Sequence, residues 1–323
     1  MTAVQVRGEV LSQRYVGAYR SLTLLAPGIA TGFKPGQFVA LAVGGPDSAT
    51  LLRRAFSVHR ASDRGSYGGT IELVYAVHGA GTLWLSRLRP GDGVDIVGPL
   101  GRAFPLPREK VSATLVGGGY GSAPLFGLAD ALQVRGSRVD FVLGAATEDR
   151  LFGALDAKRT GSTCTLTTND GSAGTKGLVS DVLAGVLERA RAEVVYACGP
   201  MAMLRAVSAV ATAHGAVAQC AVEEAMACGI GVCMTCVLPV RGDDGRTRMV
   251  RSCVEGPVFR GDRVRWDAVG TVPADTVGAP GPAESAADPV QDPPMERELP
   301  PGHPVADAAA PASSAGAVLG SLP

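Results

Sequence analysis

The first third of the chain is built from short runs in which apolar and polar residues alternate. Proline–glycine pairs at 35–36 and 90–91 interrupt the pattern, as turns do. Alternation with a period of two is typical of strands that bury one face. Strands are predicted at 4–10, 19–25, 37–43, 56–59, 70–77 and 93–97, with one helix at 82–88. This spacing predicts a small antiparallel β-barrel or sandwich domain over residues 1–107.

The pattern changes over residues 108–215, where continuous apolar runs alternate with stretches of helical period. Strands are predicted at 113–116, 138–143, 163–168 and 193–198, and helices at 124–134, 179–190 and 201–214. Regular strand–helix alternation predicts an α/β domain with a parallel sheet.

Two further segments follow. Residues 216–266 form a small cysteine-rich unit, and residues 267–323 contain no aromatic residue, no Cys and no Ile but many Pro and Ala. The last segment carries eight acidic residues and one basic residue, so residues 1–266 have a net charge of +7. A segment so poor in large apolar side chains cannot offset the entropy of ordering, and we predict a disordered acidic Pro/Ala-rich tail over 267–323.

The bulk composition narrows the functional classes. The whole chain has a formal net charge of zero, which gives no general attraction to nucleic acid or to acidic membranes. No apolar run is long enough to span a bilayer, and residues 1–10 do not have the pattern of a signal peptide. Seven cysteines without an export signal indicate reduced thiols or metal ligands, so a cytoplasmic location is expected.

Four cysteines have the spacing of a metal centre. Cys228, Cys233 and Cys236 form a C-x4-C-x2-C loop, and Cys253 follows after 16 residues. This is the plant-type [2Fe–2S] spacing, and glycines at 229 and 231 permit the tight backbone that such a loop needs. Zinc is the alternative metal, although its usual ligands come as two separated pairs, and simple buried thiols are the third interpretation.

The other three cysteines do not fit this spacing. Cys220 lies eight residues before the loop, and Cys164 lies in a predicted strand where a core position is expected. Cys198 ends another predicted strand and is followed by Gly199 and Pro200. Parallel sheets bind ligands beyond the carboxyl ends of their strands. Cys198 is therefore either a core thiol or a neighbour of a bound nicotinamide ring.

A glycine-rich turn joins a predicted strand to a predicted helix, with glycines at Gly117, Gly118, Gly119 and Gly121. Such a turn lets the backbone approach a pyrophosphate, whose charge is favoured by the N-terminus of the following helix. Pro124 suits a first helical turn. The third glycine of the usual dinucleotide fingerprint is missing, so a plain tight turn is the alternative.

The barrel region contains two weaker signals. Arg53 and Arg54 precede Phe56 and Ser57, which sets guanidinium groups suited to phosphate beside an aromatic ring. A second possible phosphate turn contains Gly79, Gly81 and Thr82. An arginine pair on a strand is more often solvated. The four histidines, at 59, 78, 214 and 303, show no metal-binding or hydrolytic pattern.

Taken in order, these features resemble the ferredoxin reductase-like superfamily. Within it, residues 4–262 are similar to the electron transfer subunits of dihydroorotate dehydrogenases, and the tail lies outside the resemblance. The similarity is carried by Leu51–Arg54, Gly98–Gly101, Thr168–Gly177, Glu223–Cys233 and Cys253–Phe259.

The resemblance implies three cofactors on this chain. FAD would bind the barrel at Arg54, Phe56 and Ser57, with Gly79, Gly81 and Thr82 near its pyrophosphate. NAD would bind at Gly117, Gly118, Gly119 and Gly121 and near Cys198, Gly199 and Pro200, and the four cysteines would hold a [2Fe–2S] cluster. Phe56 departs from the family pattern, in which an aliphatic residue or Tyr is expected.

The resemblance also implies a partner. An FMN-containing dihydroorotate dehydrogenase catalytic subunit would oxidise dihydroorotate in pyrimidine biosynthesis, in a heterotetramer with this chain. Electrons would pass from FMN through the cluster and FAD to NAD+, and no catalytic residue for dihydroorotate is expected here. The alternatives are a flavin/iron–sulfur subunit of a hydrogenase or sulfide-linked reductase, and a non-enzymatic, zinc-stabilised nucleotide-binding regulator. Visible absorption separates the regulator, since zinc sites are colourless.

Overall fold

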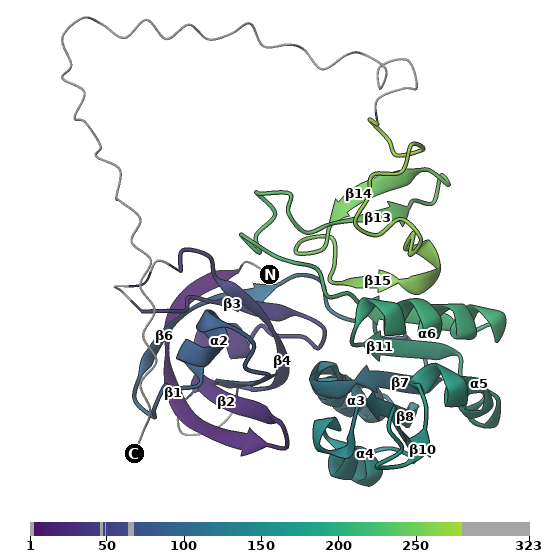
Figure 1. Ribbon diagram of the computed structural model, residues 1–323, viewed down its shortest axis with the longest axis horizontal. Helices are drawn as coiled ribbons and strands as arrows, with labels where there is room; N and C mark the ends of the chain where they lie inside the picture. The colour runs from purple at the N-terminus through teal and green to yellow at the C-terminus, as the bar shows by residue number, and fades with distance from the viewer. Residues whose placement is uncertain (1–2, 46–47, 49, 64–67, 280–323) are drawn as a thin grey trace, which may run out of the picture. The chain divides into compact units, whose positions relative to one another are not determined.

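A closed antiparallel barrel forms the N-terminal part of the chain, as predicted (Figure 1). The structure is a computed structural model that describes residues 3–45, 48, 50–63 and 68–279. The barrel order is β1-β2-β5-β4-β3-β6. Its strands are β1 (Val4–Val16), β2 (Tyr19–Leu25), β3 (Phe38–Leu41), β4 (Arg54–Ser62), β5 (Thr70–Tyr75) and β6 (Gly93–Leu100).

The alternating pattern of the sequence produces the barrel core. Leu22 and Leu24 of β2 and Ile71 and Leu73 of β5 are fully buried. Burying a side chain of this size contributes about 1.5–3 kcal/mol. β1 continues six residues beyond its predicted end at Val10, because a bulge after Val10 lets it keep pairing with β2. The short helices of this part are α1 (Pro27–Ala30) and α2 (Ala80–Leu85).

The second part is a seven-stranded sheet in the order β10-β9-β8-β7-β11-β12-β15. All neighbours pair in parallel except β15, which is antiparallel to β12. The strands are β7 (Ser112–Gly118), β8 (Arg138–Ala145), β9 (Thr163–Thr168), β10 (Thr175–Lys176), β11 (Val194–Cys198), β12 (Val217–Ala221) and β15 (Val258–Arg260). The parallel α/β prediction is therefore confirmed.

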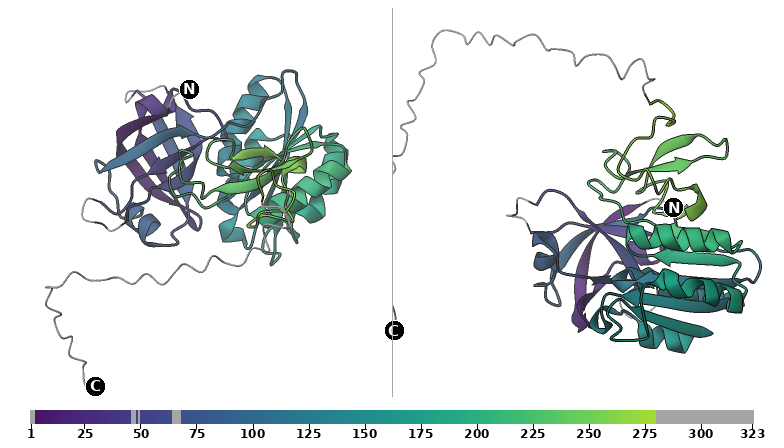
Figure 2. Two further views of the ribbon diagram at one scale, coloured as in Figure 1. Left: turned by 90° about the horizontal axis from the view of Figure 1, so that it is seen from above. Right: turned by 45° about the vertical axis from the view of Figure 1, so that its right-hand side comes forward.

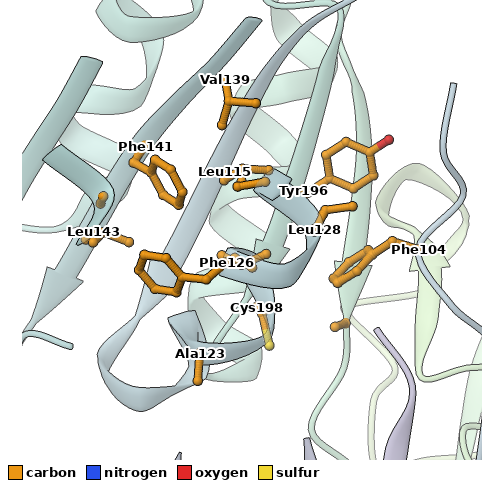
Figure 3. Packing of buried hydrophobic residues seen from close by; sticks show 14 of the residues in the cluster. Phe104, Leu115, Ala123, Phe126, Leu128, Val139, Phe141, Leu143, Tyr196 and Cys198 are labelled. Carbon is orange, nitrogen blue, oxygen red and sulfur yellow. The ribbon is translucent and has the colours of Figure 1, made fainter. Parts of the chain in front are cut away.

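Helices cover both faces of this sheet (Figure 2). They are α3 (Ala123–Val134), α4 (Ala154–Thr160), α5 (Val179–Ala190) and α6 (Met201–Ala213). α3 and α4 bury apolar residues on one face, and α5 and α6 do so on the other. Figure 3 shows Phe126 of α3 beside Phe141 of β8, and their rings stack with centroids 5.4 Å apart. Cys198 and Ala123 lie at one end of this layer (Figure 3).

The structure divides the cysteine-rich segment differently from the prediction. β12 and β15, which lie within the predicted unit 216–266, belong to the α/β sheet. Between them lie the loop with Cys228, Cys233 and Cys236, then a hairpin of β13 (Val237–Arg241) and β14 (Thr247–Arg251), then the turn with Cys253. The two cysteine segments together are called the four-cysteine loop. A sheet that looks complete at β11 along the sequence thus gains two strands from the following segment.

The start of the predicted tail is also part of the fold. Thr276 bridges Thr247 of β14, and Asp275 forms an ion pair with Arg265 at 2.9 Å. Residues 267–279 therefore pack on the hairpin, whereas residues 280–323 of the predicted tail lie outside the described residues. No helix in the described ranges is long and apolar enough to cross a bilayer.

Candidate functional site

A cavity of about 760 Å³ brings the nucleotide signals of the sequence together. Its walls come from the barrel, from the turn between β7 and α3, from the end of β11 and from the segment after β12. Ten of the thirteen predicted FAD and NAD positions line it: Arg54, Phe56, Ser57, Thr82, Gly118, Gly119, Gly121, Cys198, Gly199 and Pro200. Gly79, Gly81 and Gly117 lie outside the lining: Gly79 caps α2, Gly81 is in its first turn, and Gly117 is near the end of β7.

The two arginines of the barrel motif have different surroundings. Arg53 forms an ion pair with Asp95 at 2.7 Å and donates a hydrogen bond to the Asp95 carbonyl. Arg54 lines the cavity and donates from Nη1 to the carbonyl of Leu52 at 2.8 Å. Arg53 is therefore held by the barrel, and Arg54 is the guanidinium available to a ligand in the cavity.

The start of α2 lies against this arginine. A Cβ at Gly81 would come within 3.0 Å of Val43 and 3.5 Å of the Arg54 side chain. The hydroxyl of Thr82 accepts hydrogen bonds from the backbone N–H groups of His78 and Gly79. Only a residue without a side chain fits Gly81 comfortably, so the helix start and the guanidinium form one surface.

Two aromatic side chains form the floor of the cavity on its barrel side. Phe56 contacts Tyr75 edge-to-face, with ring centroids 5.8 Å apart, and both line the cavity. The hydroxyl of Tyr75 accepts a hydrogen bond from Gln13 at 2.9 Å, and burial raises the pKa of Tyr75 to about 12. The floor is thus apolar and neutral, as a surface for a flat aromatic ligand must be.

The glycine turn packs directly against the end of β11. A Cβ on Gly121 would lie 2.9 Å from the Cα of Gly199, and one on Gly118 would lie 2.8 Å from the sulfur of Met203. Gly119 has a φ of +54°, a backbone conformation that favours glycine. α3 begins at Ala123 with Pro124 in its first turn, so its free N–H groups face the same turn. The turn has the features of a pyrophosphate site.

Cys198 lines the cavity as a neutral thiol. Burial, and secondly the Glu223 carboxylate, raise the pKa of Cys198 to about 12. Burial and Glu223 also raise the pKa of Tyr120. Glu223 and Glu224 both line the cavity, and burial raises the pKa of Glu224. Both carboxylates belong to the segment Glu223–Cys233 that carries the family resemblance, but the sequence gives them no site role, because the pairing of β12 beside β11 is what brings them to the cavity.

The four-cysteine loop packs on the outside of the barrel. Cys236 and Cys253 are buried against Phe38, Ala40 and Leu100 of strands β3 and β6. Phe38 also lines the cavity, and so does Met226 just before the loop. Phe38 and Met226 therefore lie between the cysteine loop and the cavity and contact both.

The thiols of the loop form two pairs. Cys233 is close enough to Cys228 to affect the pKa of Cys228, and, second to burial, Cys236 raises the pKa of Cys253 in the same way. Within the described ranges, no three Cys, His, Asp or Glu residues are grouped around a single ion position. A [2Fe–2S] cluster takes four thiolates on two irons, so the donor set and its division into pairs fit that group.

Hydrogen bonds to sulfur favour the thiolate form on the exposed side of the loop. The hydroxyl of Thr235 donates to Cys233 at 3.2 Å, and this bond, followed by backbone N–H groups, lowers the pKa of Cys233 to about 6. Partial burial opposes the effect at Cys228, but backbone N–H groups lower the pKa of Cys228 below its ordinary value. Thiolate is the form that binds metal.

The backbone of the loop is held from behind by an ion pair. Gly229 and Gly231 have φ values of +71° and +85°. Arg251 donates to the carbonyl of Gly231 at 2.9 Å and forms an ion pair with Glu255 at 2.6 Å. The sequence did not predict this pair, because neither Arg251 nor Glu255 belongs to the cysteine spacing or to another recognisable motif.

The remaining candidates lie elsewhere. Cys220 is buried in β12 on the face covered by α5 and α6, and burial raises the pKa of Cys220 to about 12. Cys164 is half-buried in β9. His59 is buried between the barrel and α3, with Nδ1 2.7 Å from the carbonyl of Ala123, and burial lowers the pKa of His59. These positions are structural.

A barrel and a parallel α/β sheet that share one cavity, followed by a four-cysteine loop, define an oxidoreductase of the ferredoxin reductase-like class. A family model described as the iron–sulfur cluster binding domain of dihydroorotate dehydrogenase B matches residues 223–265. An oxidoreductase NAD-binding domain model matches residues 115–209.

Curated relatives make the assignment more specific. The chain is 38% identical over 261 residues to the dihydroorotate dehydrogenase B (NAD(+)) electron transfer subunit of Geobacillus thermodenitrificans, covering 80% of this chain and 97% of that one. The subunit of the same name from Listeria monocytogenes is 36% identical, with 81% and 99% covered. This chain belongs to the family of dihydroorotate dehydrogenase B electron transfer subunits.

Solved structures agree on the fold. A chain of an NADH-dependent reduced ferredoxin–NADP oxidoreductase superposes with a TM-score of 0.70 at 30% identity, covering 82% of this chain and 91% of that one. A Neisseria gonorrhoeae ferredoxin NADP+ reductase superposes at 0.53 with 16% identity, covering 65% and 92%.

Proposed function

We propose that this chain is the NAD-linked electron transfer subunit of a cytoplasmic dihydroorotate dehydrogenase complex. Electrons from an FMN-containing catalytic subunit would pass through a [2Fe–2S] cluster and FAD to NAD+, and the complex would be a heterotetramer. The observation that carries the proposal is the position of Phe38, which contacts the cysteine loop on one side and lines the cavity on the other. One barrel wall therefore joins the two redox sites.

FAD suits the barrel side of the cavity. Arg54, Ser57 and the start of α2 at Gly79, Gly81 and Thr82 would hold its phosphates, and Phe56 would support its ring. FAD would supply the exchange between single electrons and a hydride. The protein contributes a positive charge, a helix start and an apolar floor.

NAD suits the opposite side. The turn Gly117, Gly118, Gly119 and Gly121 would bind the pyrophosphate, and Cys198, Gly199 and Pro200 would border the nicotinamide. These two turns touch one another, so a dinucleotide bound to one is oriented by the other. This arrangement would keep the nicotinamide ring next to the barrel wall.

The partner would dock where the cysteine loop is exposed. Cys233 is exposed, and the side chains around the thiols include the exposed apolar residues Ile230, Val232, Met234 and Val254. Exposed apolar side chains gathered around one site often mark a protein interface. This surface, which we name the loop patch, would bring the catalytic subunit close to the cluster.

Reconstitution tests the proposal. The isolated chain, loaded with FAD and iron, is expected to reduce dyes with NADH but not to oxidise dihydroorotate. Adding the FMN-containing subunit is expected to restore electron transfer from dihydroorotate to NAD+. Dihydroorotate oxidation by this chain alone would contradict its role as an electron transfer subunit.

A second candidate has a specific observation in its favour. The solved relative with 30% identity is named for reduced ferredoxin and NADP, not for dihydroorotate. A related flavin/iron–sulfur reductase role would use the same cavity and loop with a different electron donor. The same assay separates the two, because only the first couples to dihydroorotate and only the second to reduced ferredoxin.

A further inference from the structure

One carboxylate at the cavity has no counter-ion. Glu223 lies two residues beyond the end of β12, and β12 pairs with β11 so that Ala221 is opposite Cys198. The backbone N–H of Val222 donates to the carbonyl of Pro257 at 2.9 Å, which fixes the chain just before Glu223. No ion pair or hydrogen bond joins the Glu223 side chain to another residue of the described ranges.

The neighbours of Glu223 show where it lies within the cavity. Its carboxylate acts electrostatically on Cys198 and on Tyr120, which belong to the two turns on the nucleotide side. Glu223 also leads directly into Met226 and the loop that packs on the barrel wall. It therefore stands where the nucleotide side of the cavity meets the barrel side.

The proposed function places the nicotinamide ring at this junction, since a hydride must pass between that ring and a flavin on the barrel wall. The oxidised ring of NAD+ carries a positive charge, whereas the ring of NADH is neutral. A hydride, which is two electrons and one proton, would pass from the reduced flavin to the ring, so that the flavin would return to its oxidised form and the ring would lose its positive charge. A nearby carboxylate attracts the ring before this step and no longer does so afterwards.

We propose that Glu223 is a selectivity residue that makes this site bind NAD+ more tightly than NADH. The inference rests on the proposed function and deepens it. Electrostatic attraction to Glu223 would hold the electron acceptor during the reaction, and its loss on reduction would promote release of NADH. The direction of electron flow through the complex would thus be supported by one side chain at the cavity.

The test compares two nucleotides on the full chain loaded with FAD and iron. Isothermal titration calorimetry would measure the Kd of NAD+ and of 1,4,5,6-tetrahydro-NAD, a neutral analogue that cannot donate a hydride. Glu223→Gln keeps the shape and removes the charge. We expect it to weaken NAD+ binding by about 5- to 10-fold and to change the Kd of the analogue by less than about twofold. Glu109→Gln, an exposed carboxylate outside the cavity, is the control and is expected to change neither.

The possible outcomes separate the two proposals. Equal weakening of both nucleotides by Glu223→Gln would indicate a purely structural role and overturn this inference alone. Unchanged binding of both would also overturn it. If the unaltered protein binds neither nucleotide, the proposed function fails and this inference fails with it.

Discussion

At the scale of single residues, four thiols are the proposed ligands of the cluster. Changing Cys228, Cys233, Cys236 or Cys253 to Ser is expected to remove most of the visible absorbance of the cluster, because each change would take from one iron one of its two protein thiolates. Cys220→Ser is the matched control, since this thiol is buried in β12 beneath α6. Absorbance spectra and iron per chain measure the effect. Loss with Cys220→Ser and retention with Cys253→Ser would reassign the fourth ligand.

The two neighbouring arginines offer a second test at this scale. Arg54→Ala is expected to weaken FAD binding by about 10- to 100-fold, because a hydrogen bond to a charged group contributes about 1.5–3 kcal/mol. Arg53→Ala is expected to lower the melting temperature instead, because it removes the partner of Asp95. Flavin retention after dialysis and thermal melts would measure these effects. Full retention of FAD by Arg54→Ala would contradict the proposal that Arg54 binds a phosphate of FAD.

Residue types and spacings predict some of the site but not the contacts made by folding. The cysteine spacing and the glycines of the β7–α3 turn are visible in the sequence because their geometry is local. Glu223 reaches the cavity only through the pairing of β12 with β11, and Arg251 reaches the loop only through the β13–β14 hairpin. Such contacts join residues whose relation is not local, so no short pattern predicts them.

At the scale of elements, the sequence predicts best those strands and helices whose own apolar and polar residues alternate regularly. The predicted bounds agree with the structure for β2, β9 and α5. The short helix α4 and strand β12 were not predicted. α4 buries one residue fully, Ala157, and β12 is a five-residue strand that extends the sheet beyond β11, its last predicted strand. Elements of this kind take their structure from their neighbours.

Contact between two turns gives a prediction at the element scale. Gly121→Ala places a Cβ 2.9 Å from Gly199, so the β7–α3 turn and the end of β11 must separate. NADH-dependent dye reduction is expected to fall by about 10-fold or more, since small displacements of bound reactants cost large factors in rate. FAD content is expected to stay unchanged. Gly185→Ala in α5 is the control, because its Cβ meets only the flexible end of Arg189. Undiminished activity in Gly121→Ala would show that the turns tolerate separation.

At the scale of the whole molecule, the boundary of the tail predicted from composition differs from the boundary that packing gives. The shift toward Pro and Ala begins at Asp267, yet Asp275 and Thr276 contact Arg265 and Thr247. Backbone bonds, two ion pairs with Arg265 and a hydrogen bond from the Thr247 hydroxyl to Asp275 attach this segment, and none of these contacts depends on large apolar side chains. Composition therefore predicts where a core ends better than where an ordered chain ends.

Docking of the catalytic subunit on the loop patch would depend on the exposed apolar side chains there. Val232 is 76% exposed in the loop patch, one residue before Cys233. Val232→Glu would place a charge in the proposed interface with the catalytic subunit, and burying an unpaired charge there would be costly. Electron transfer from the dihydroorotate-oxidising subunit is expected to fall at least about 10-fold, whereas NADH-dependent dye reduction, which does not need the patch, is expected to persist.

A matched variant shows whether the position or the added charge is responsible. Val134 is 89% exposed at the end of α3, away from the cysteine loop, and Val134→Glu adds the same charge there. It is expected to leave both reactions unchanged. The coupled rate should be measured over a range of partner concentrations, because weakened docking is overcome by excess partner whereas a damaged cluster is not. If Val232→Glu and Val134→Glu couple equally well to the partner, the catalytic subunit docks on a different surface.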